Sequence, residues 1–208
     1  MPAVTVDFYW DVGSTNTYFA WHLIKPVIAR HQAALVLHPF NLGYVFRTHN
    51  YQLMDEPKDK LKNRKRDLQR WADRYRLPFR MPDQFPIKSS VALRASLVAR
   101  EMGAEWAFVE AILARYWETN DPSIQQVDGL LHIAEGLGLN RATFAARLAA
   151  PQVRQGLIDS TQKALDRGVF GAPFIAVGDE LYWGKDRMEF VDDHLARLVA
   201  AQGEAVLS

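Results

Sequence analysis

The chain has 208 residues, and its 25 Lys and Arg against 24 Asp and Glu give a formal net charge of +1. This balance gives no reason to expect a nucleic-acid partner. The sequence contains no cysteine, which excludes disulfides, zinc–thiolate sites and dithiol redox chemistry by its own residues. The six histidines lack the spacing of metal ligands, so no metal site is expected. Without a long apolar run or a secretory signal pattern, we expect a cytoplasmic protein that does not enter the membrane.

The first 40 residues predict a strand, a helix and a second strand. Residues 3–10 are rich in Val, Phe, Tyr and Trp, which is typical of a buried strand. A Gly-Ser turn then opens a helix at Thr15, in which Pro26 is expected to cause a kink or a break. Residues 34–40 form the second predicted strand, and such a unit places its two strands parallel.

The middle of the chain is predicted to be helical. A basic helix with one apolar face is expected over residues 57–76, and three prolines then mark an extended loop up to Pro86. The glycines, prolines and N-cap residues that follow predict further helices at about 89–102, 105–117, 122–138, 140–148 and 151–167.

The last part of the chain returns to strands. Residues 174–177 and 181–183 are predicted strands joined by a tight turn, and a closing helix is expected from Arg187 to about Val199. We therefore expect an α/β domain made of residues 1–42 and 151–208. A helical insertion domain of residues 43–150 interrupts it.

Two short motifs, one near each end of the chain, could carry chemistry. Ser14 precedes the first helix, where unpaired N–H groups and the helix dipole favour an anion. Its hydroxyl serves either as an ordinary N-cap or as a donor to a thiolate brought by a ligand. Pro173 starts the third strand, where proline cannot join a regular ladder. It is either an edge-strand proline or part of a cis Ala172-Pro173 bond that exposes the preceding peptide.

These motifs, in this order, resemble the thioredoxin superfamily. More narrowly, the chain resembles the family of 2-hydroxychromene-2-carboxylate isomerases and kappa-class glutathione transferases. The residues that carry the resemblance are Asp7-Phe8-Tyr9, Ser14, Tyr18, residues 67–72, residues 170–173 and residues 183–187. The resemblance implies a thioredoxin-like fold of the DsbA and kappa-transferase type with a helical insertion, glutathione as the cofactor, and a homodimer.

The resemblance also implies roles for single residues. Ser14 would activate the thiol of glutathione, and the Ala172 peptide before Pro173 would pair with the tripeptide like an added strand. The polar ends of glutathione would be bound by Asn50, Lys60, Lys185, Asp186 and Arg187. On local sequence alone, Asp186 is equally suited to be an N-cap and Lys60 to be a solvated charge. Three positions differ from the usual family pattern, since Thr15 replaces Pro, Asn63 replaces Tyr, and Lys185 replaces Ser or Asn.

The implied activity is the glutathione-dependent cis–trans isomerisation of a small aromatic carboxylate, as in the catabolism of naphthalene-type compounds. Addition of the thiolate to a conjugated carbon turns a double bond into a rotatable single bond, and release of glutathione gives the trans product. Phe85 and Lys88 follow the proline-rich loop, and Lys88 could bind the substrate carboxylate. Two alternatives remain open, a kappa-class-like transferase that conjugates an electrophile and a non-catalytic thioredoxin-like binding module.

Overall fold

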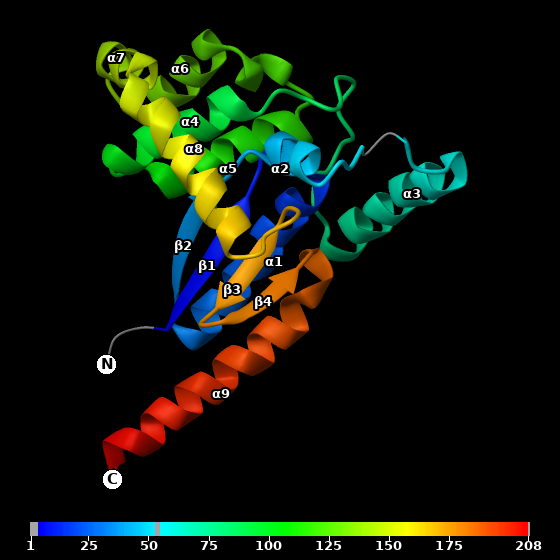
Figure 1. The fold of residues 1–208 in the computed structure, drawn as a ribbon, viewed down its shortest axis with the longest axis vertical. Helices are drawn as coiled ribbons and strands as arrows, with labels where there is room; N and C mark the ends of the chain where they lie inside the picture. Colours follow the sequence, from blue (N-terminus) through cyan, green and yellow to red (C-terminus); the bar gives the residue numbers. More distant parts are fainter. Residues whose placement is uncertain (1–3, 53–54, 208) are drawn as a thin grey trace.

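The structure, a computed structural model, describes residues 4–52 and 55–207. Its centre is a four-stranded sheet with the strand order β2-β1-β3-β4 (Figure 1). The strands are β1 (Thr5–Trp10), β2 (Ala34–Pro39), β3 (Phe174–Val177) and β4 (Glu180–Trp183). β1 and β2 are parallel, as predicted, whereas β3 is antiparallel to both β1 and β4.

The alternation of side chains along the strands gives the sheet two buried faces. In β1, Val6, Phe8 and Trp10 join the larger core, which also includes apolar residues of α1 (Thr15–His31) and of α9 (Met188–Leu207). Tyr9, on the opposite face of β1, joins a smaller core with Phe174 and with Ala164 of α8 (Pro151–Asp166). The period-two pattern of a strand explains this division.

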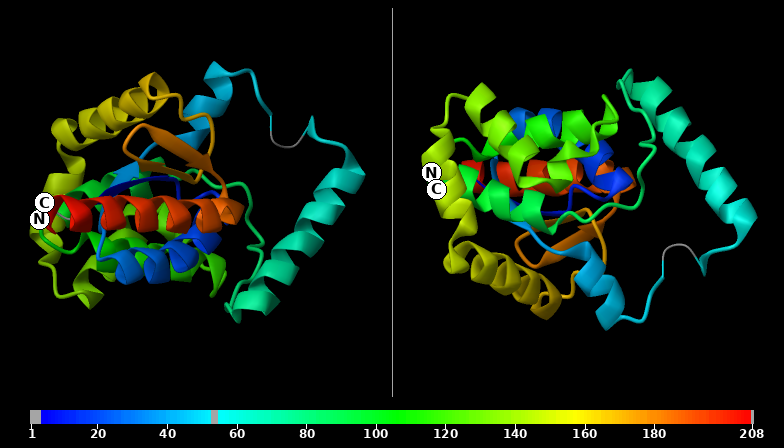
Figure 2. Two further views of the ribbon diagram at one scale, coloured as in Figure 1. Left: turned by 90° about the horizontal axis from the view of Figure 1, so that it is seen from below. Right: turned by 90° about the horizontal axis from the view of Figure 1, so that it is seen from above.

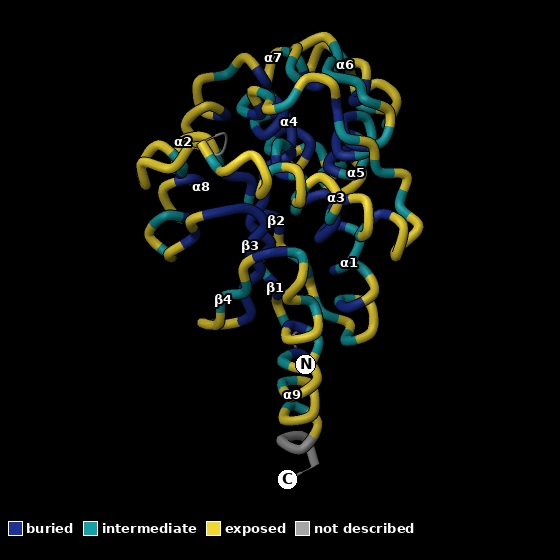
Figure 3. The backbone as a smooth tube through the Cα atoms, turned by 90° about the vertical axis from the view of Figure 1, so that its right-hand side faces the viewer, coloured by how far each residue is buried: buried dark blue, intermediate teal, exposed yellow. Residues whose placement is uncertain are grey.

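The remaining helices lie between β2 and α8 in the sequence. They are α2 (Leu42–Thr48), α3 (Lys58–Tyr75), α4 (Ser90–Glu101), α5 (Glu105–Trp117), α6 (Val127–Gly136) and α7 (Arg141–Ala149). α4 to α7 pack together at one end of the sheet (Figure 1), and the inner turns of this group are buried (Figure 3). Residues 77–89 form the predicted loop between α3 and α4.

α3 differs from the other helices because it stands to one side of the molecule (Figure 2). Only Leu68 and Ala72 of this helix are buried, both in its C-terminal half. Lys185, which follows β4, places its ammonium group 4.5 Å from the ring centroid of Trp71 in the same half. α3 is therefore fixed at its C-terminal half, while the residues of its N-terminal half face the rest of the protein across an open space.

The structure differs from the sequence expectations at two places. Of the kink or break expected at Pro26, the break does not occur, since α1 continues to His31 with Ile24 and Val27 buried on either side of the proline. Packing of these two side chains holds the helix despite the hydrogen bond that proline removes. The predicted helix over residues 122–138 is divided into a short 3-10 helix, η2 (Pro122–Gln125), and α6. Asp121 caps η2 through its side chain, which accepts from the Ser123 N–H at 2.9 Å.

Candidate functional site

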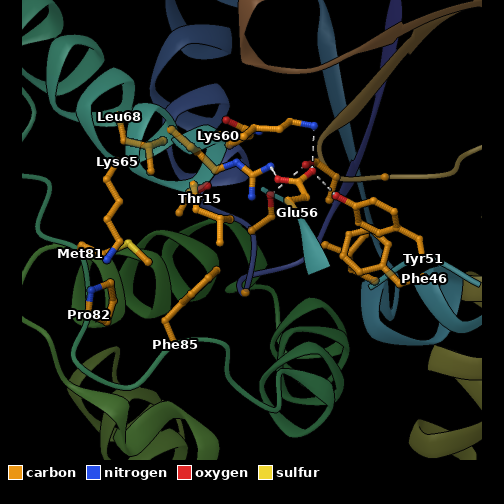
Figure 4. Close-up of a pocket in the computed structure, with 18 of the residues that line it drawn as sticks. Thr15, Phe46, Tyr51, Glu56, Lys60, Lys65, Leu68, Met81, Pro82 and Phe85 are labelled. Carbon is orange, nitrogen blue, oxygen red and sulfur yellow. Dashed lines mark hydrogen bonds and ion pairs between the residues drawn. The ribbon is translucent and has the colours of Figure 1, made fainter. Parts of the chain in front are cut away.

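A cleft of about 930 Å³ lies between α3 and the end of the sheet. Its walls come from the start of α1, one face of α2, the part of α3 from Lys60 to Leu68 and the proline-rich loop (Figure 4). The turn before β3 and the end of β4 complete the lining. Ser14 and Ala172 both line it, so the two ends of the chain meet there. We call this space the Ser14 cleft. Its volume lies within the usual range of ligand pockets in proteins.

Ser14 is the N-cap of α1 and also contacts the second motif. Its Oγ accepts a hydrogen bond from the Thr17 N–H at 3.4 Å, and it donates one to the Ala172 carbonyl oxygen at 2.8 Å. The side chain is largely buried, although Ser14 still forms part of the cleft wall. Thr15 and Asn16, in the first turn of α1, line the cleft as well. The positive end of the helix dipole therefore faces the space in front of the Ser14 hydroxyl.

The turn that carries Ser14 is held by the buried carboxylate of Asp11. One carboxylate oxygen accepts from the Gly13 N–H at 2.8 Å, and the other accepts from the Leu42 N–H and the Ser89 hydroxyl, each at 2.9 Å. Burial raises the pKa of the Asp11 carboxyl, and these three hydrogen bonds oppose that rise. Asp11 thus ties the starts of α1, α2 and α4 together behind the cleft.

The Ala172-Pro173 bond is cis, which confirms one of the two interpretations of the motif. Beside it, the exposed rings of Phe170 and Trp183 meet edge to face at 5.0 Å and line the cleft. A Cβ on Gly171 would lie 2.7 Å from Trp183 Nε1, so the indole can cover this turn only because residue 171 is glycine. Trp183 is 52% exposed, which identifies it as part of the cleft wall and not of the core.

One part of the cleft carries a network of charged and polar side chains around Glu56 (Figure 4). Glu56 forms ion pairs with Lys60, at 3.0 Å, and with Arg64, and it accepts a hydrogen bond from the Tyr51 hydroxyl at 2.8 Å. Burial alone would raise the pKa of the Glu56 carboxyl, but the contacts with these three residues hold that pKa below its usual value. Lys60 therefore lines the Ser14 cleft, but it already forms an ion pair with Glu56.

The other end of the cleft is mainly apolar and contains Leu68, Met81, Pro82 and Phe85 (Figure 4). Lys65 enters this end from α3, next to Met81 and Pro82. Among the residues that the structure describes, no carboxylate forms an ion pair with Lys65. This end of the cleft therefore combines an apolar lining with the Lys65 cation and with the Asp83 carboxylate, which pairs with Arg80 at 3.5 Å.

The sequence-predicted site residues are divided between the cleft and its surroundings. Ser14, Lys60, Phe85 and Ala172 line the cleft, and Pro173 follows the lining residue Ala172. Asn50 lies between two lining residues, His49 and Tyr51, but is not itself part of the lining, and Lys88 does not line the cleft either. The remaining three predicted residues are Lys185, Asp186 and Arg187, which do not line it.

Lys185, Asp186 and Arg187 form a short 3-10 helix, η3, directly before α9. The Lys185 ammonium group covers Trp71, and burial lowers the pKa of Lys185. Arg187 pairs with Asp186 at 3.4 Å. This segment thus lies behind the C-terminal half of α3.

Several residues of the site were not found from the sequence. Arg64 and Lys65 lie on the face of α3 that also includes Leu61 and Leu68, and all four line the cleft. The spacing of four and seven residues could have indicated this shared face, because such positions lie close together on a helix surface. Phe170 and Trp183 belong to the segments that carry the family resemblance, but their place in the cleft lining was not predicted.

The described residues contain no group of three or more His, Asp or Glu side chains placed to hold a metal ion. In the same part of the chain, each helix is too short or too polar to span a lipid bilayer.

Comparison with known proteins agrees with the sequence motifs. Residues 5–196 match the family described as DSBA-like thioredoxin domain. A protein of Sphingobium xenophagum named 2-hydroxychromene-2-carboxylate isomerase is 30% identical over 194 residues, which are 92% of this chain and 97% of that protein. Glutathione S-transferase kappa 1 of Caenorhabditis elegans is 24% identical over 208 residues, covering 91% of this chain and 90% of that protein.

Among solved structures, that of a selenomethionine-labelled 2-hydroxychromene-2-carboxylate isomerase superposes with a TM-score of 0.83 and 26% identity. It covers 98% of this chain and 99% of the other. The likeness extends over nearly the whole length of both chains in sequence and in structure. The chain therefore belongs to the DsbA-like thioredoxin family and, within it, to the group that contains 2-hydroxychromene-2-carboxylate isomerase and kappa-class glutathione transferase.

Proposed function

We propose that this protein is a glutathione-dependent cis–trans isomerase that acts on a small aromatic carboxylate of the hydroxychromene type. The observation that carries the proposal is the contact between the Ser14 hydroxyl and the Ala172 carbonyl at the N-terminus of α1. In a chain without cysteine, this arrangement suits a thiolate brought by a ligand. The name of the Sphingobium xenophagum relative supports the same reaction.

The chemistry of the cleft fits glutathione. The Ala172 N–H has no acceptor among the described residues, and the Ala172 carbonyl accepts from a hydroxyl that can rotate away. One peptide unit can therefore offer both a donor and an acceptor to an extended tripeptide. His49 and Lys60 extend the lining in the direction of α2 and α3, where a carboxylate of the tripeptide would find a partner. When bound, glutathione supplies the thiolate that adds to a conjugated carbon and is later expelled, so that it acts as a cofactor.

Ser14 has one hydroxyl proton, which the structure directs at the Ala172 carbonyl. We propose that this carbonyl exchanges the hydroxyl for a peptide N–H of the tripeptide. The Ser14 proton then turns toward the sulfur position and stabilises negative charge there. Because one hydrogen bond replaces another at the carbonyl, the exchange leaves no buried polar group without a partner.

Lys65 is the residue that we propose to bind the substrate carboxylate. The apolar end of the cleft, with Met81 and Phe85, offers a surface for a planar ring, and Lys65 lies at its edge. Lys88, the candidate from the sequence, does not line the cleft. The charge of Lys65 would orient the acid so that its conjugated system faces Ser14.

The test of this function follows the ultraviolet spectrum of hydroxychromene carboxylate after the protein and glutathione are added. Conversion to the trans product with no loss of free thiol is the expected result. Loss of free thiol with formation of a conjugate would instead support a transferase, which is the second candidate because of the kappa-class relative. No calorimetric heat with glutathione would leave only a binding module.

A further inference from the structure

A second cleft, of about 560 Å³, lies between α2, α4 and α8. Its lining shares no residue with the Ser14 cleft. The two are separated by α2, which Figure 1 shows beside α8 and in front of α5. Leu42 and Phe46 face the Ser14 cleft, whereas Asn41, Tyr44 and Arg47 face the second one. The spacing of three residues between Asn41, Tyr44 and Arg47 places them along one side of the helix.

The second cleft is lined by three arginines from three helices, Arg47 of α2, Arg94 of α4 and Arg154 of α8. Within the described chain, none of these guanidinium groups forms an ion pair with a carboxylate, and no Asp or Glu lines this cleft. The one lining side chain that contacts a carboxylate is Gln162, whose amide donates to Asp166 at 2.8 Å. We call this space the arginine cleft. Three arginines without acidic partners in one lining make this cleft positively charged.

The rest of the arginine cleft combines apolar surface with a few polar groups. Tyr44 and Ile158 are 48% and 51% exposed although both are large and apolar, and they line the cleft with Leu157. The Arg47 guanidinium lies 5.9 Å from the centroid of the Tyr44 ring. Ser90, at the start of α4, contributes a hydroxyl to the lining. A ligand would therefore meet both an apolar surface and several hydrogen-bond donors.

We propose that the arginine cleft binds a small organic phosphate whose apolar part is a flat ring. A phosphate fits the three guanidinium groups because they donate charge-assisted hydrogen bonds in the geometry that phosphate oxygens accept. The ring lies against Tyr44 and Ile158. The volume suits a ligand of drug-like size, and the proposal depends on this geometry alone, not on the activity of the Ser14 cleft.

The experiment uses naphthyl phosphate as the probe in calorimetry, with saturating glutathione present so that the Ser14 cleft is occupied. The wild-type chain should bind the probe, and added salt should weaken the binding because screening reduces the attraction between charges. Arg94→Gln and Arg154→Gln should each weaken binding about tenfold. Naphthol, which lacks the phosphate, and inorganic phosphate, which lacks the ring, should each bind at least tenfold more weakly than the probe.

Two matched variants keep the test specific. Arg197→Gln removes one exposed arginine from α9, and Lys65→Gln removes a cation from the Ser14 cleft. Neither should change the affinity for the probe. No binding by the wild type, equal binding of naphthol, an equal loss in Arg197→Gln, or a loss only in Lys65→Gln would each overturn the proposal. Arg154 is an exposed residue, so its variant preserves the test if Arg94→Gln fails to fold.

Discussion

The two clefts on either side of α2 differ in how their positive charges are balanced. In the Ser14 cleft, Glu56 pairs with both Lys60 and Arg64, and a serine hydroxyl lies at a helix N-terminus. In the arginine cleft, three arginines belong to a lining that contains no carboxylate. The first cleft is thus suited to directing one negative atom at a defined point, and the second to attracting a dianion. Seven residues of α2 are sufficient to separate two different electrostatic environments.

The largest effect is expected from removing the support that both clefts share. Asp11→Ala leaves the Gly13 and Leu42 N–H groups without their acceptor, and it should lower the free energy of unfolding by about 2–4 kcal/mol. Affinities for glutathione and for naphthyl phosphate should both fall. Leu42 lines the Ser14 cleft, and Ser89 directly precedes Ser90, which lines the arginine cleft. Urea unfolding and calorimetry measure these changes. Ser89→Ala, which removes a single donor to the same carboxylate, should cost about 1 kcal/mol.

The effect of Asp11→Ala should also depend on pH. Burial raises the pKa of Asp11 above its ordinary value of 3.8, so the folded chain holds the proton more tightly than the unfolded chain does. The stabilising contribution of Asp11 is therefore fully present below pH 3.8 and declines as the pH rises through the raised pKa. The difference in unfolding free energy between wild type and variant should shrink over that window. If the difference in unfolding free energy grew with pH, the raised pKa of Asp11 would be contradicted.

Ser14→Ala should affect the Ser14 cleft alone. Loss of one directed donor to a developing negative charge should lower kcat/KM by roughly 100-fold at neutral pH. The pKa of the bound thiol should rise, so the deficit should become smaller as the pH approaches the free thiol value of about 8.5. The ultraviolet absorbance of the thiolate, titrated with bound glutathione, measures this shift. Thr15→Val is the control, and an unchanged titration in Ser14→Ala would remove Ser14 from the mechanism.

Lys65→Gln tests whether the two ends of the Ser14 cleft bind different molecules. If Lys65 binds the substrate carboxylate, KM for the aromatic acid should rise about tenfold while kcat changes little. The affinity for glutathione should remain the same. Steady-state kinetics with Arg66→Gln as control, an exposed neighbour that does not line the cleft, measures the effect. An equal change in both variants would indicate general charge attraction.

The smallest effect is expected from Glu56→Gln, which makes the Ser14 cleft more like the arginine cleft. Without this carboxylate, Lys60 and Arg64 lose their partner and can bind a carboxylate of glutathione, so its affinity should increase about threefold. Calorimetry at low salt is the measurement, and Asp59→Asn, which removes a nearby carboxylate in the first turn of α3, is the control. A weaker affinity in Glu56→Gln would show that Glu56 itself contacts the tripeptide.

The local parts of the fold were predictable because they depend on neighbouring residues. The strand–helix–strand unit follows from apolar periodicity and turn residues, and the N-cap at Ser14 and the cis bond at Pro173 were each one of two interpretations left open by the sequence. The sequence could not decide whether α1 breaks at Pro26, since its continuation depends on burial of side chains by distant segments.

The cleft was less predictable than the fold because its composition depends on how distant elements face each other. Lys65 lines the cleft because Leu68 and Ala72 pack into the core and fix the rotation of α3, whereas Lys88 does not line it. The burial of Lys185 against Trp71 likewise results from the position of α3 beside η3. Sequence spacing gives the faces of each helix, but packing decides which face meets the cleft.

The hydrogen bond between Ser14 and Ala172 joins residues 158 positions apart. No continuous fragment of the chain that lacks either terminal region can therefore contain the site. A domain-by-domain truncation would abolish ligand binding at the first cut, even where the shortened piece kept its helices. Conversely, a circular permutant that opens the chain between α6 and α7 would keep Ser14 and Ala172 in place, and it should still bind the ligand.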